Sequence, residues 1–252
     1  MEIIESVQNK QVKEWKKLLT RRGRSKQQKY LVEGDHLVEE AIKSESPIDA
    51  IIIRDDKADK FEAYSESFNT VLITTEIAEL LSDTVTNQGL FAVINIIEET
   101  EKIEGRKPVL LLDEVQDPGN LGTLIRTADA AGFEGVVIGK GSVDLHNPKA
   151  LRSAQGSHFH LPVIHDDLTK WIDFFEKRRI AVFGTALDSR AISYRDLTPP
   201  ETFALIVGNE GSGVNPAFLK RTTENLYIPI KGEAESLNVA VAASVLMFSL
   251  YQ

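Results

Sequence analysis

Short apolar runs without polar alternation dominate the second half of the chain. The first is 109–112, and five more follow at 136–138, 161–164, 180–183, 203–207 and 226–228. Such runs are typical of parallel strands that are covered on both faces. Helical patterns separate them, over 121–131, 148–155, 168–179 and 237–250. We therefore predict an α/β fold in this part, an open and mainly parallel sheet with helices on both faces.

The first hundred residues show a different pattern, typical of a smaller α/β domain. The expected strands are 30–32, 51–53, 71–73 and 90–97, and the expected helices are 35–43 and 76–81. A charged, glycine-containing stretch closed by Pro108 separates the two parts. We predict an N-terminal domain over 1–97, a linker over 98–107 and a second domain over 108–252.

Composition narrows the classes of function. The 252-residue chain has no cysteine, which excludes disulfides, thiolate zinc sites, iron–sulfur ligation and cysteine nucleophiles. No apolar run reaches the ~20 residues that a membrane-spanning helix needs, and the first residues lack the apolar core of a signal peptide. We therefore expect a cytoplasmic protein with no membrane contact. The five histidines form no H-E-x-x-H pattern, so we expect no metal.

Charge is distributed unevenly along the chain. The formal net charge of −9 by itself argues against a polyanionic partner. Residues 10–29, however, hold nine basic side chains and one acidic one, so this stretch carries +8 and the remainder −17. We expect an amphipathic helix that runs into an arginine-rich loop at 21–24. Its basic side chains are either a solvated helix face or a nucleic-acid surface. The candidates for RNA contact are Lys10, Lys17, Arg21, Arg22, Arg24 and Lys26.

Three glycine-containing loops follow predicted strands of the second domain, at 117–122, 208–213 and 231–238. Open parallel sheets bind ligands at the carboxyl ends of their strands, and a strand-to-helix turn presents free amides to an anion. None of the three loops is a P-loop or a G-x-G-x-x-G dinucleotide-binding turn, which speaks against ATP and NAD.

Each loop taken alone also has a purely structural explanation. Arg126, in the helix after the first loop, can pair with Asp129 at i+3. Glu210 can cap the turn that follows it. Ser236 or Asn238 can be the N-cap of the last helix. A ligand site is favoured because all three loops stand at strand ends of one domain.

Taken in order, the three loops resemble motifs 1, 2 and 3 of the SpoU (TrmH-type) RNA 2′-O-ribose methyltransferases of the SPOUT superfamily. The order and spacing of the motifs make the resemblance specific. The stretch 147–162 is also similar to the family, and residues 1–97 are similar to the L30e-like substrate-binding domain that many members carry. The matching motifs are Asn120-x-Gly122-x-x-x-Arg126, Gly208-x-Glu210-Gly211-x-Gly213, and Ile228-Pro229-Ile230 followed by Ser236-Leu237-Asn238.

The resemblance implies an S-adenosylmethionine-dependent RNA methyltransferase that acts on a ribose 2′-hydroxyl. It also implies a parallel α/β catalytic domain with a C-terminal trefoil knot, a homodimer formed through that domain, and no need for a metal. The cofactor contacts that it implies are Thr185, Ala186, Leu187, Gly208, Glu210, Gly213, Ile228, Ile230 and Leu237. The reaction-site residues that it implies are Asn120, Arg126, Glu210, Ser236 and Asn238.

The high pKa of a guanidinium group limits the roles that Arg126 can have. The family's arginine has been cast as a base, but a pKa above ~12 makes a neutral guanidinium costly. We therefore expect Arg126 to clamp a neighbouring phosphate and to stabilise developing negative charge. Glu210 and a phosphate oxygen are then the alternative proton acceptors.

Two further expectations concern partners. The last helix, 237–250, is apolar almost all round, which fits a core helix and also a buried dimer interface. The N-terminal domain favours ribosomal RNA as the substrate, the large-subunit rRNA above all, over transfer RNA. A non-catalytic RNA-binding or ribosome-assembly protein is the alternative from another class, and the intact motif residues count against it.

Overall fold

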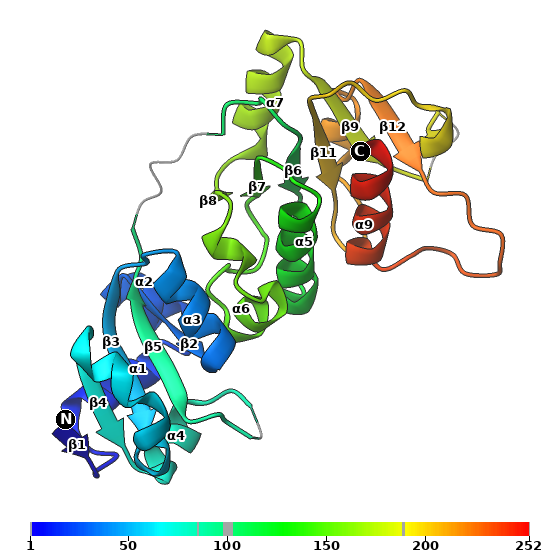
Figure 1. Ribbon diagram of the computed structural model, residues 1–252. Helices are drawn as coiled ribbons and strands as arrows, with labels where there is room; N and C mark the ends of the chain where they lie inside the picture. Colours follow the sequence, from blue (N-terminus) through cyan, green and yellow to red (C-terminus); the bar gives the residue numbers. More distant parts are fainter. Residues whose placement is uncertain (1, 85, 98–102, 188–189, 252) are drawn as a thin grey trace. The chain divides into compact units, whose positions relative to one another are not determined.

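The chain divides into two compact units (Figure 1). The structure is a computed structural model that describes residues 2–84, 86–97, 103–187 and 190–251. Unit 1 consists of Met1–Glu98 together with Asp144–Phe159, and unit 2 of Glu99–Val143 and His160–Gln252. A segment from the predicted second domain therefore packs within unit 1. The predicted linker lies partly outside the described residues, and the domain boundaries stay a prediction.

Unit 1 is built on a mixed five-stranded sheet in the order β1-β4-β3-β5-β2. Strands β1, β4 and β3 are parallel, whereas β5 and β2 run antiparallel to their neighbours. The strands are β1 (Glu2–Ile4), β2 (Lys29–Glu33), β3 (Ile48–Arg54), β4 (Thr70–Ile73) and β5 (Leu90–Asn95). The helices are α1 (Lys10–Lys17), α2 (Arg21–Gln27), α3 (Asp35–Lys43), α4 (Thr75–Leu81) and α6 (Pro148–Ala154), with 3-10 turns η1 (Asp55–Lys57), η2 (Asp59–Glu66) and η3 (Ser157–Phe159).

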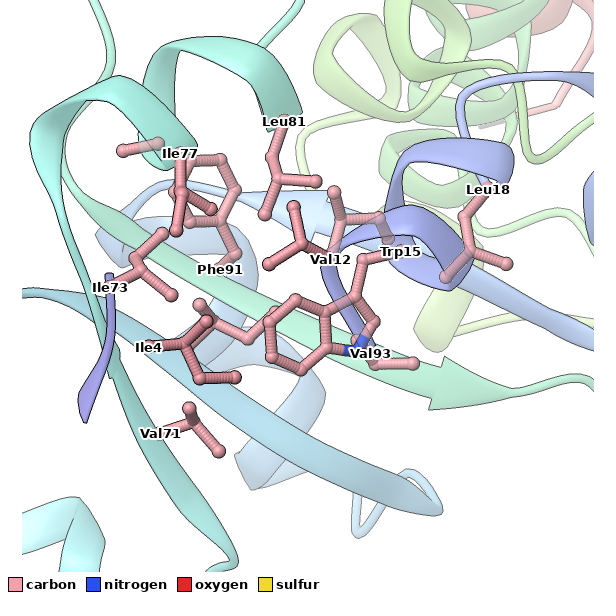
Figure 2. Packing of buried hydrophobic residues seen from close by; sticks show 13 residues of the cluster. Ile4, Val12, Trp15, Leu18, Val71, Ile73, Ile77, Leu81, Phe91 and Val93 are labelled. Carbon is pink, nitrogen blue, oxygen red and sulfur yellow. The ribbon is translucent and has the colours of Figure 1, made fainter. Parts of the chain in front are cut away.

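The amphipathic pattern of the first helix is confirmed. Val12 and Trp15 stand three residues apart on α1 and turn inward together with Leu18, which follows the helix. They pack with side chains of α4 and of the sheet, among them Phe91 (Figure 2). The lysines of α1 are left on the opposite, exposed side.

The arginine-rich stretch is a helix, α2, and not the loop that we expected. The side chain of Thr20 caps α2 by accepting a hydrogen bond from the backbone N–H of Gly23 at 3.1 Å. A Cβ at Gly23 would lie 1.9 Å from the carbonyl oxygen of Lys17, so only glycine lets α2 pack against the end of α1. The expectation failed because glycine, a poor helix former, was read as a loop residue rather than as a close contact.

Arg24 is buried, and this corrects its assignment to the RNA surface. Its guanidinium is held at one end by the carbonyl oxygen of Leu18 at 2.8 Å. At the other end its Nε and Nη2 donate to Oδ2 of Asp144, at 3.0 and 2.5 Å. Burial acts to raise the pKa of the Asp144 carboxyl, but Arg24 outweighs it and the pKa lies below its ordinary value. Arg24 therefore anchors the returning segment and has no surface to offer RNA.

The rest of segment Asp144–Phe159 is held on unit 1 by apolar and polar contacts. Leu151 of α6 is 1% exposed and joins the core formed around α3. Arg152 donates to Asp83 at 2.9 Å, in a pair that remains partly exposed. The backbone carbonyl of Gln155 lies 3.0 Å from Nε2 of His36.

Unit 2 is built on seven parallel strands in the order β10-β12-β9-β11-β6-β7-β8, which confirms the predicted parallel α/β fold. All six predicted strands are present, and the two-residue strand β10 was missed. The strands are β6 (Val109–Leu112), β7 (Gly135–Ile138), β8 (Val163–His165), β9 (Ala181–Thr185), β10 (Ile192–Ser193), β11 (Phe203–Val207) and β12 (Glu224–Tyr227). The helices are α5 (Pro118–Ala130), α7 (Leu168–Arg178), α8 (Pro216–Leu219) and α9 (Val239–Leu250), with the 3-10 turn η4 (Tyr194–Asp196).

The central strands of unit 2 are buried on both faces, as their uninterrupted apolar runs predicted. All four residues of β6 and all five of β11 are buried. Helix α7 covers one face through Leu168, Ile172 and Phe175. Helices α5 and α9 pack side by side in unit 2 (Figure 1). The start of α5 and the start of α9 are thereby brought together.

Candidate active site

The three motif loops meet at one edge of the unit 2 sheet. Strands β12, β9, β11 and β6 are consecutive neighbours and all parallel, so their carboxyl ends share that edge. The first loop leaves β6, the second leaves β11, and the third leaves β12 and leads into α9. This is the edge at which open parallel sheets bind ligands.

The second loop is a tight hairpin that carries Glu210 at its tip. The backbones of Asn209 and Gly213 exchange two hydrogen bonds, at 3.1 and 2.9 Å. A Cβ at Gly208 would lie 2.1 Å from the carbonyl carbon of Gly213, so the hairpin requires glycine there. The side-chain oxygen of Asn209 accepts from the N–H groups of Gly211 and Ser212 and fixes the turn.

Three donors from the first loop hold the carboxylate of Glu210. The backbone N–H of Gln116 donates at 3.2 Å, that of Asp117 at 3.1 Å, and Nδ2 of Asn120 at 3.0 Å. Burial acts to raise the pKa of the Glu210 carboxyl, but these hydrogen bonds, that from Asn120 first, bring it below its ordinary value. Glu210 therefore stays ionised and tied to the start of α5.

Asn120 also receives a hydrogen bond from the third loop. Nδ2 of Asn238 donates to Oδ1 of Asn120 at 2.9 Å. Asn238 is the N-cap of α9, and its own Oδ1 accepts from the N–H groups of Ala240 and Val241. The structure thus brings Glu210, Asn120 and Asn238 together in one chain of hydrogen bonds, with one residue from each motif.

Two further contacts join the first and second loops, and the sequence interpretation missed both. Nδ2 of Asn209 donates to the carbonyl oxygen of Glu114 at 2.9 Å. Oδ2 of Asp113, which is 5% exposed, accepts from the N–H of Asn215 at 2.7 Å. Burial raises the pKa of the Asp113 carboxyl. The position of Asp113 directly after a buried strand was the only sequence signal for its contact, and that position does not reveal Asn215 as the partner.

Arg126 stands on the exposed surface of α5, six residues beyond Asn120. Within the described residues its guanidinium forms no hydrogen bond or ion pair, so the expected alternative of a pair with Asp129 is wrong. Oδ2 of Asp129 instead lies 2.9 Å from Nδ1 of His160. Ser236 is likewise exposed, and within the described part of the chain its side chain forms no hydrogen bond. Both groups are available to a ligand.

The cofactor candidates gather at the ends of β9, β11 and β12. Oγ1 of Thr185 donates to the carbonyl oxygen of Ile206 at 3.2 Å, and the N–H of Ala186 donates to that of Leu226 at 3.1 Å. Leu187 is 68% exposed and Leu237 38% exposed, which leaves apolar surface open at this edge. Intermediate exposure is shared by Ile228 and Ile230. An ideal Cβ at Gly213 would meet no atom within 4 Å, so the hairpin borders open space.

The basic candidates of unit 1, Arg24 apart, are exposed. Lys10 and Lys17 border a shallow hollow on α1 that Lys13 and Lys16 also line. Lys17 is paired with Glu14 at 2.6 Å. Exposed positions on α2 are Arg21, Arg22 and Lys26. The described residues therefore present a basic surface along α1 and α2.

Metal-binding clusters and membrane-spanning helices are both absent from the described residues. Among them, no group of three or more histidine, aspartate or glutamate side chains is arranged to hold a metal ion. In the same ranges, no helix combines the length and the apolar character that crossing a bilayer requires.

Two family models match the chain, one in each part. The SpoU rRNA methylase family matches residues 107–248, and the MRM3-like substrate-binding domain matches residues 9–92. The first match covers more than half of the chain and includes all three motif loops.

Named relatives extend the similarity to nearly the whole chain. The 23S rRNA (guanosine(2553)-2′-O)-methyltransferase RlmP of Bacillus subtilis (strain 168) is 46% identical over 250 residues, which are 99% of each chain. A crystal structure of an RNA 2′-O ribose methyltransferase superposes with a TM-score of 0.85 at 27% identity, over 98% of this chain and 97% of that one. The SpoU methyltransferase AviRb of Streptomyces viridochromogenes, in complex with AdoMet, gives a TM-score of 0.86 at 25% identity, over 96% and 97%.

Proposed function

Because the chain belongs to the SpoU rRNA methylase family, we propose that it transfers a methyl group from S-adenosylmethionine to a ribose 2′-hydroxyl of large-subunit ribosomal RNA. The observation that carries the proposal is the meeting of the three motif loops at one sheet edge, where Glu210, Asn120 and Asn238 are joined by hydrogen bonds of 3.0 and 2.9 Å. The full-length similarity to a 23S rRNA enzyme supports the RNA class.

The strand-end residues fit the proposed cofactor. When bound, S-adenosylmethionine would supply a methyl group on a positively charged sulfur. This sulfur is a good leaving group because it departs as a neutral thioether. The open apolar side chains of Leu187 and Leu237 suit an adenine ring, and the hairpin at Gly213 leaves room beside them. We assign the cofactor to the ends of β9, β11 and β12, with the contacts named from the sequence.

The protein's own task is to orient the ribose and to stabilise the charge that develops on its 2′-oxygen. Arg126 suits this task because its guanidinium is exposed and free of intramolecular partners among the described residues. We assign it to a phosphate next to the target ribose, held in the forked geometry that guanidinium allows. Ser236, exposed in the third loop, is assigned to the same site.

We assign RNA capture to the basic surface of α1 and α2. Replacing Arg21, Arg22 and Lys26 together by alanine should weaken RNA binding and reduce the slope of log K against log[salt] by about 0.7–0.9 per lost phosphate contact. Filter binding over a salt series measures the slope, with cofactor affinity as the control. An unchanged slope would return these side chains to a solvated helix face.

We infer a homodimer formed through unit 2, a trefoil knot in its C-terminal chain and a cytoplasmic location. The exposed apolar side chains of Val241 and Phe248, 51% and 52% exposed on α9, support a buried partner surface. The knot is supported by the sheet order, since β12 lies between β9 and β10 although it follows both in sequence. Sedimentation equilibrium of Phe248→Glu against the wild type tests the dimer.

The function is tested by mapping 2′-O-methylation across rRNA and tRNA in cells with and without the gene. We expect one large-subunit position to lose its mark, and guanosine 2553, the relative's nucleotide, is the first to examine. Purified protein should restore the mark on an unmodified 23S transcript with S-adenosylmethionine, and Arg126→Ala should not. If a 2′-O-methyl group is lost only from tRNA, the protein is a tRNA 2′-O-methyltransferase instead. If the protein binds rRNA but transfers no methyl group, it is a non-catalytic RNA-binding or ribosome-assembly protein.

A further inference from the structure

The hydrogen-bond chain through Asn120 has a fixed direction. Oδ1 of Asn238 accepts from the first amides of α9, so its Nδ2 must be the group that donates to Asn120. The carboxylate of Glu210 can only accept, so it takes the Nδ2 of Asn120. Position 120 therefore needs a side chain that accepts on one side and donates on the other, which an amide does and a carboxylate does not.

Two members of this hydrogen-bond chain, Asn238 and Asn120, belong to different halves of the site. Asn238 directly follows Leu237, a proposed cofactor contact, in a loop of which every residue from 231 to 238 is exposed. In the described part of the chain, residues 231–237 form no hydrogen bond, so Asn238 is the point at which this loop is tied down. Asn120 stands in the first turn of α5, about 9 Å along the helix axis from Arg126, at 1.5 Å per residue.

We propose that Asn120 is a positioning residue through which bound cofactor and bound RNA strengthen each other's binding. The proposal rests on the proposed function. A ligand that orders the third loop fixes Asn238, Asn238 holds Asn120, and Asn120 holds the start of the helix that carries Arg126. Ligands that favour the same arrangement of one element must favour each other, and by the same factor in both directions.

The same contacts make Glu210 an anchor for Asn120 rather than the acceptor of the ribose proton. Oε1 already accepts from Asn120 and Asp117, and Oε2 accepts from Gln116. A carboxylate that is held by three donors is a weak base, and it would have to release the first loop to take up a proton. Of the two acceptors named from the sequence, this leaves the phosphate oxygen.

The coupling is measured as the dissociation constant of S-adenosylhomocysteine, which has no methyl group to transfer, with and without saturating unmodified 23S transcript, by calorimetry on the full-length protein. In the wild type we expect RNA to lower this constant by about fivefold or more. In Asn120→Ala the ratio should fall below about twofold, while each ligand still binds alone. Ser244→Ala is the matched control, because Ser244 also bridges α9 to α5, at 3.3 Å from Thr127, but lies outside the loops. It should keep the wild-type ratio.

A reversed pair separates positioning from general damage. Asn120→Asp alone sets a second carboxylate against Glu210 and should abolish the coupling and most of the activity. Adding Glu210→Gln restores a donor for position 120 at the cost of the hydrogen bond from the N–H of Asp117, and the carboxylate introduced at position 120 still accepts from Asn238. The double variant should regain at least about tenfold in kcat over Asn120→Asp. A merely structural role predicts further loss instead.

The outcomes separate the inference from the function on which it rests. A wild type that methylates rRNA while Asn120→Ala keeps the full coupling ratio would overturn the inference alone. A reversed pair less active than Asn120→Asp would do the same. A wild type that binds no cofactor and methylates no RNA would overturn the inference and the proposed function together.

Discussion

Two carboxylates join parts of the chain that are distant in sequence, and they differ in the charge and the burial of the groups that donate to them. Asp144 in unit 1 is bound by the guanidinium of Arg24, whose side chain is 4% exposed. Glu210 in unit 2 is bound by two backbone amides and the amide of Asn120 at a more open position. The first partner carries a full charge and is buried, whereas the donors to Glu210 are neutral and border solvent.

The difference separates holding a fold together from holding a site in place. A buried charge pair costs much when one partner is removed, because the other charge stays uncompensated. Neutral donors at an open position can turn to water, so their loss costs little stability but changes where the side chains point. Unit 1 therefore uses Arg24 and Asp144 for stability, and unit 2 uses Glu210 and Asn120 for geometry.

The largest effect expected from this comparison is that of Arg24→Ala on stability. Removing the buried guanidinium leaves the largely buried Asp144 carboxylate, 18% exposed, without its cationic partner, which should lower the free energy of unfolding by about 3–5 kcal/mol. Urea unfolding followed by Trp15 fluorescence in a Trp171→Phe background reports on this unit, since Trp15 lies in its core and Trp171 packs in unit 2. Arg152→Ala, which breaks the more exposed pair with Asp83, should cost about 0–1 kcal/mol. Equal losses of unfolding free energy in Arg24→Ala and Arg152→Ala would show that the buried pair contributes no more to stability than the exposed one.

Glu210→Ala should show the opposite balance. Its three donors can reach water, so the free energy of unfolding should fall by no more than about 1 kcal/mol. Methylation should fall about 100-fold, because Asn120 and the start of α5 lose their anchor. Urea unfolding and single-turnover methylation on the same preparation give both numbers. A stability loss as large as that of Arg24→Ala would make Glu210 a structural residue.

The smallest effect expected is one of pH. The folded-state pKa of the Asp144 carboxyl is lowered, so its contribution to stability is present above the unfolded value of about 3.9 and is lost as pH falls through the folded pKa. Trp15 fluorescence should therefore report weakening of unit 1 below about pH 4. Asp144→Asn should start less stable and lose less over that interval, while Glu210→Gln, a change in unit 2, should leave the pH dependence of the Trp15 signal from unit 1 as in the wild type. Parallel curves for Asp144→Asn and the wild type would contradict the assignment.

Sequence patterns predicted what depends on local periodicity. The unalternating runs such as 203–207 indicated the parallel strands, because burial on both faces leaves no polar position. The N-cap role of Asn238 was open to prediction for the same reason, since a cap is made with the next residues along the chain. The motif resemblance supplied the family and the remaining candidate site residues.

What the patterns missed depends on partners far away in sequence. Charge density grouped Arg24 with its exposed neighbours, because nothing near it in sequence reveals Asp144, 120 residues later. The contact from Asn238 to Asn120 spans 118 residues and is set by the packing of α9 on α5. Strand β10 was missed because two residues are too few for any alternation.

The return of segment Asp144–Phe159 to unit 1 sets an order for synthesis. Its partners in unit 1, Arg24 and Asp83 among them, leave the ribosome long before the segment does. Unit 1 can therefore be completed only after the first strands of unit 2 have been made, so the two units mature in an overlapping sequence. If the chain is cut before Pro108, the C-terminal fragment keeps this segment but lacks the unit 1 surface that buries Leu151. Dissection of the protein at that point should expose apolar surface on both fragments.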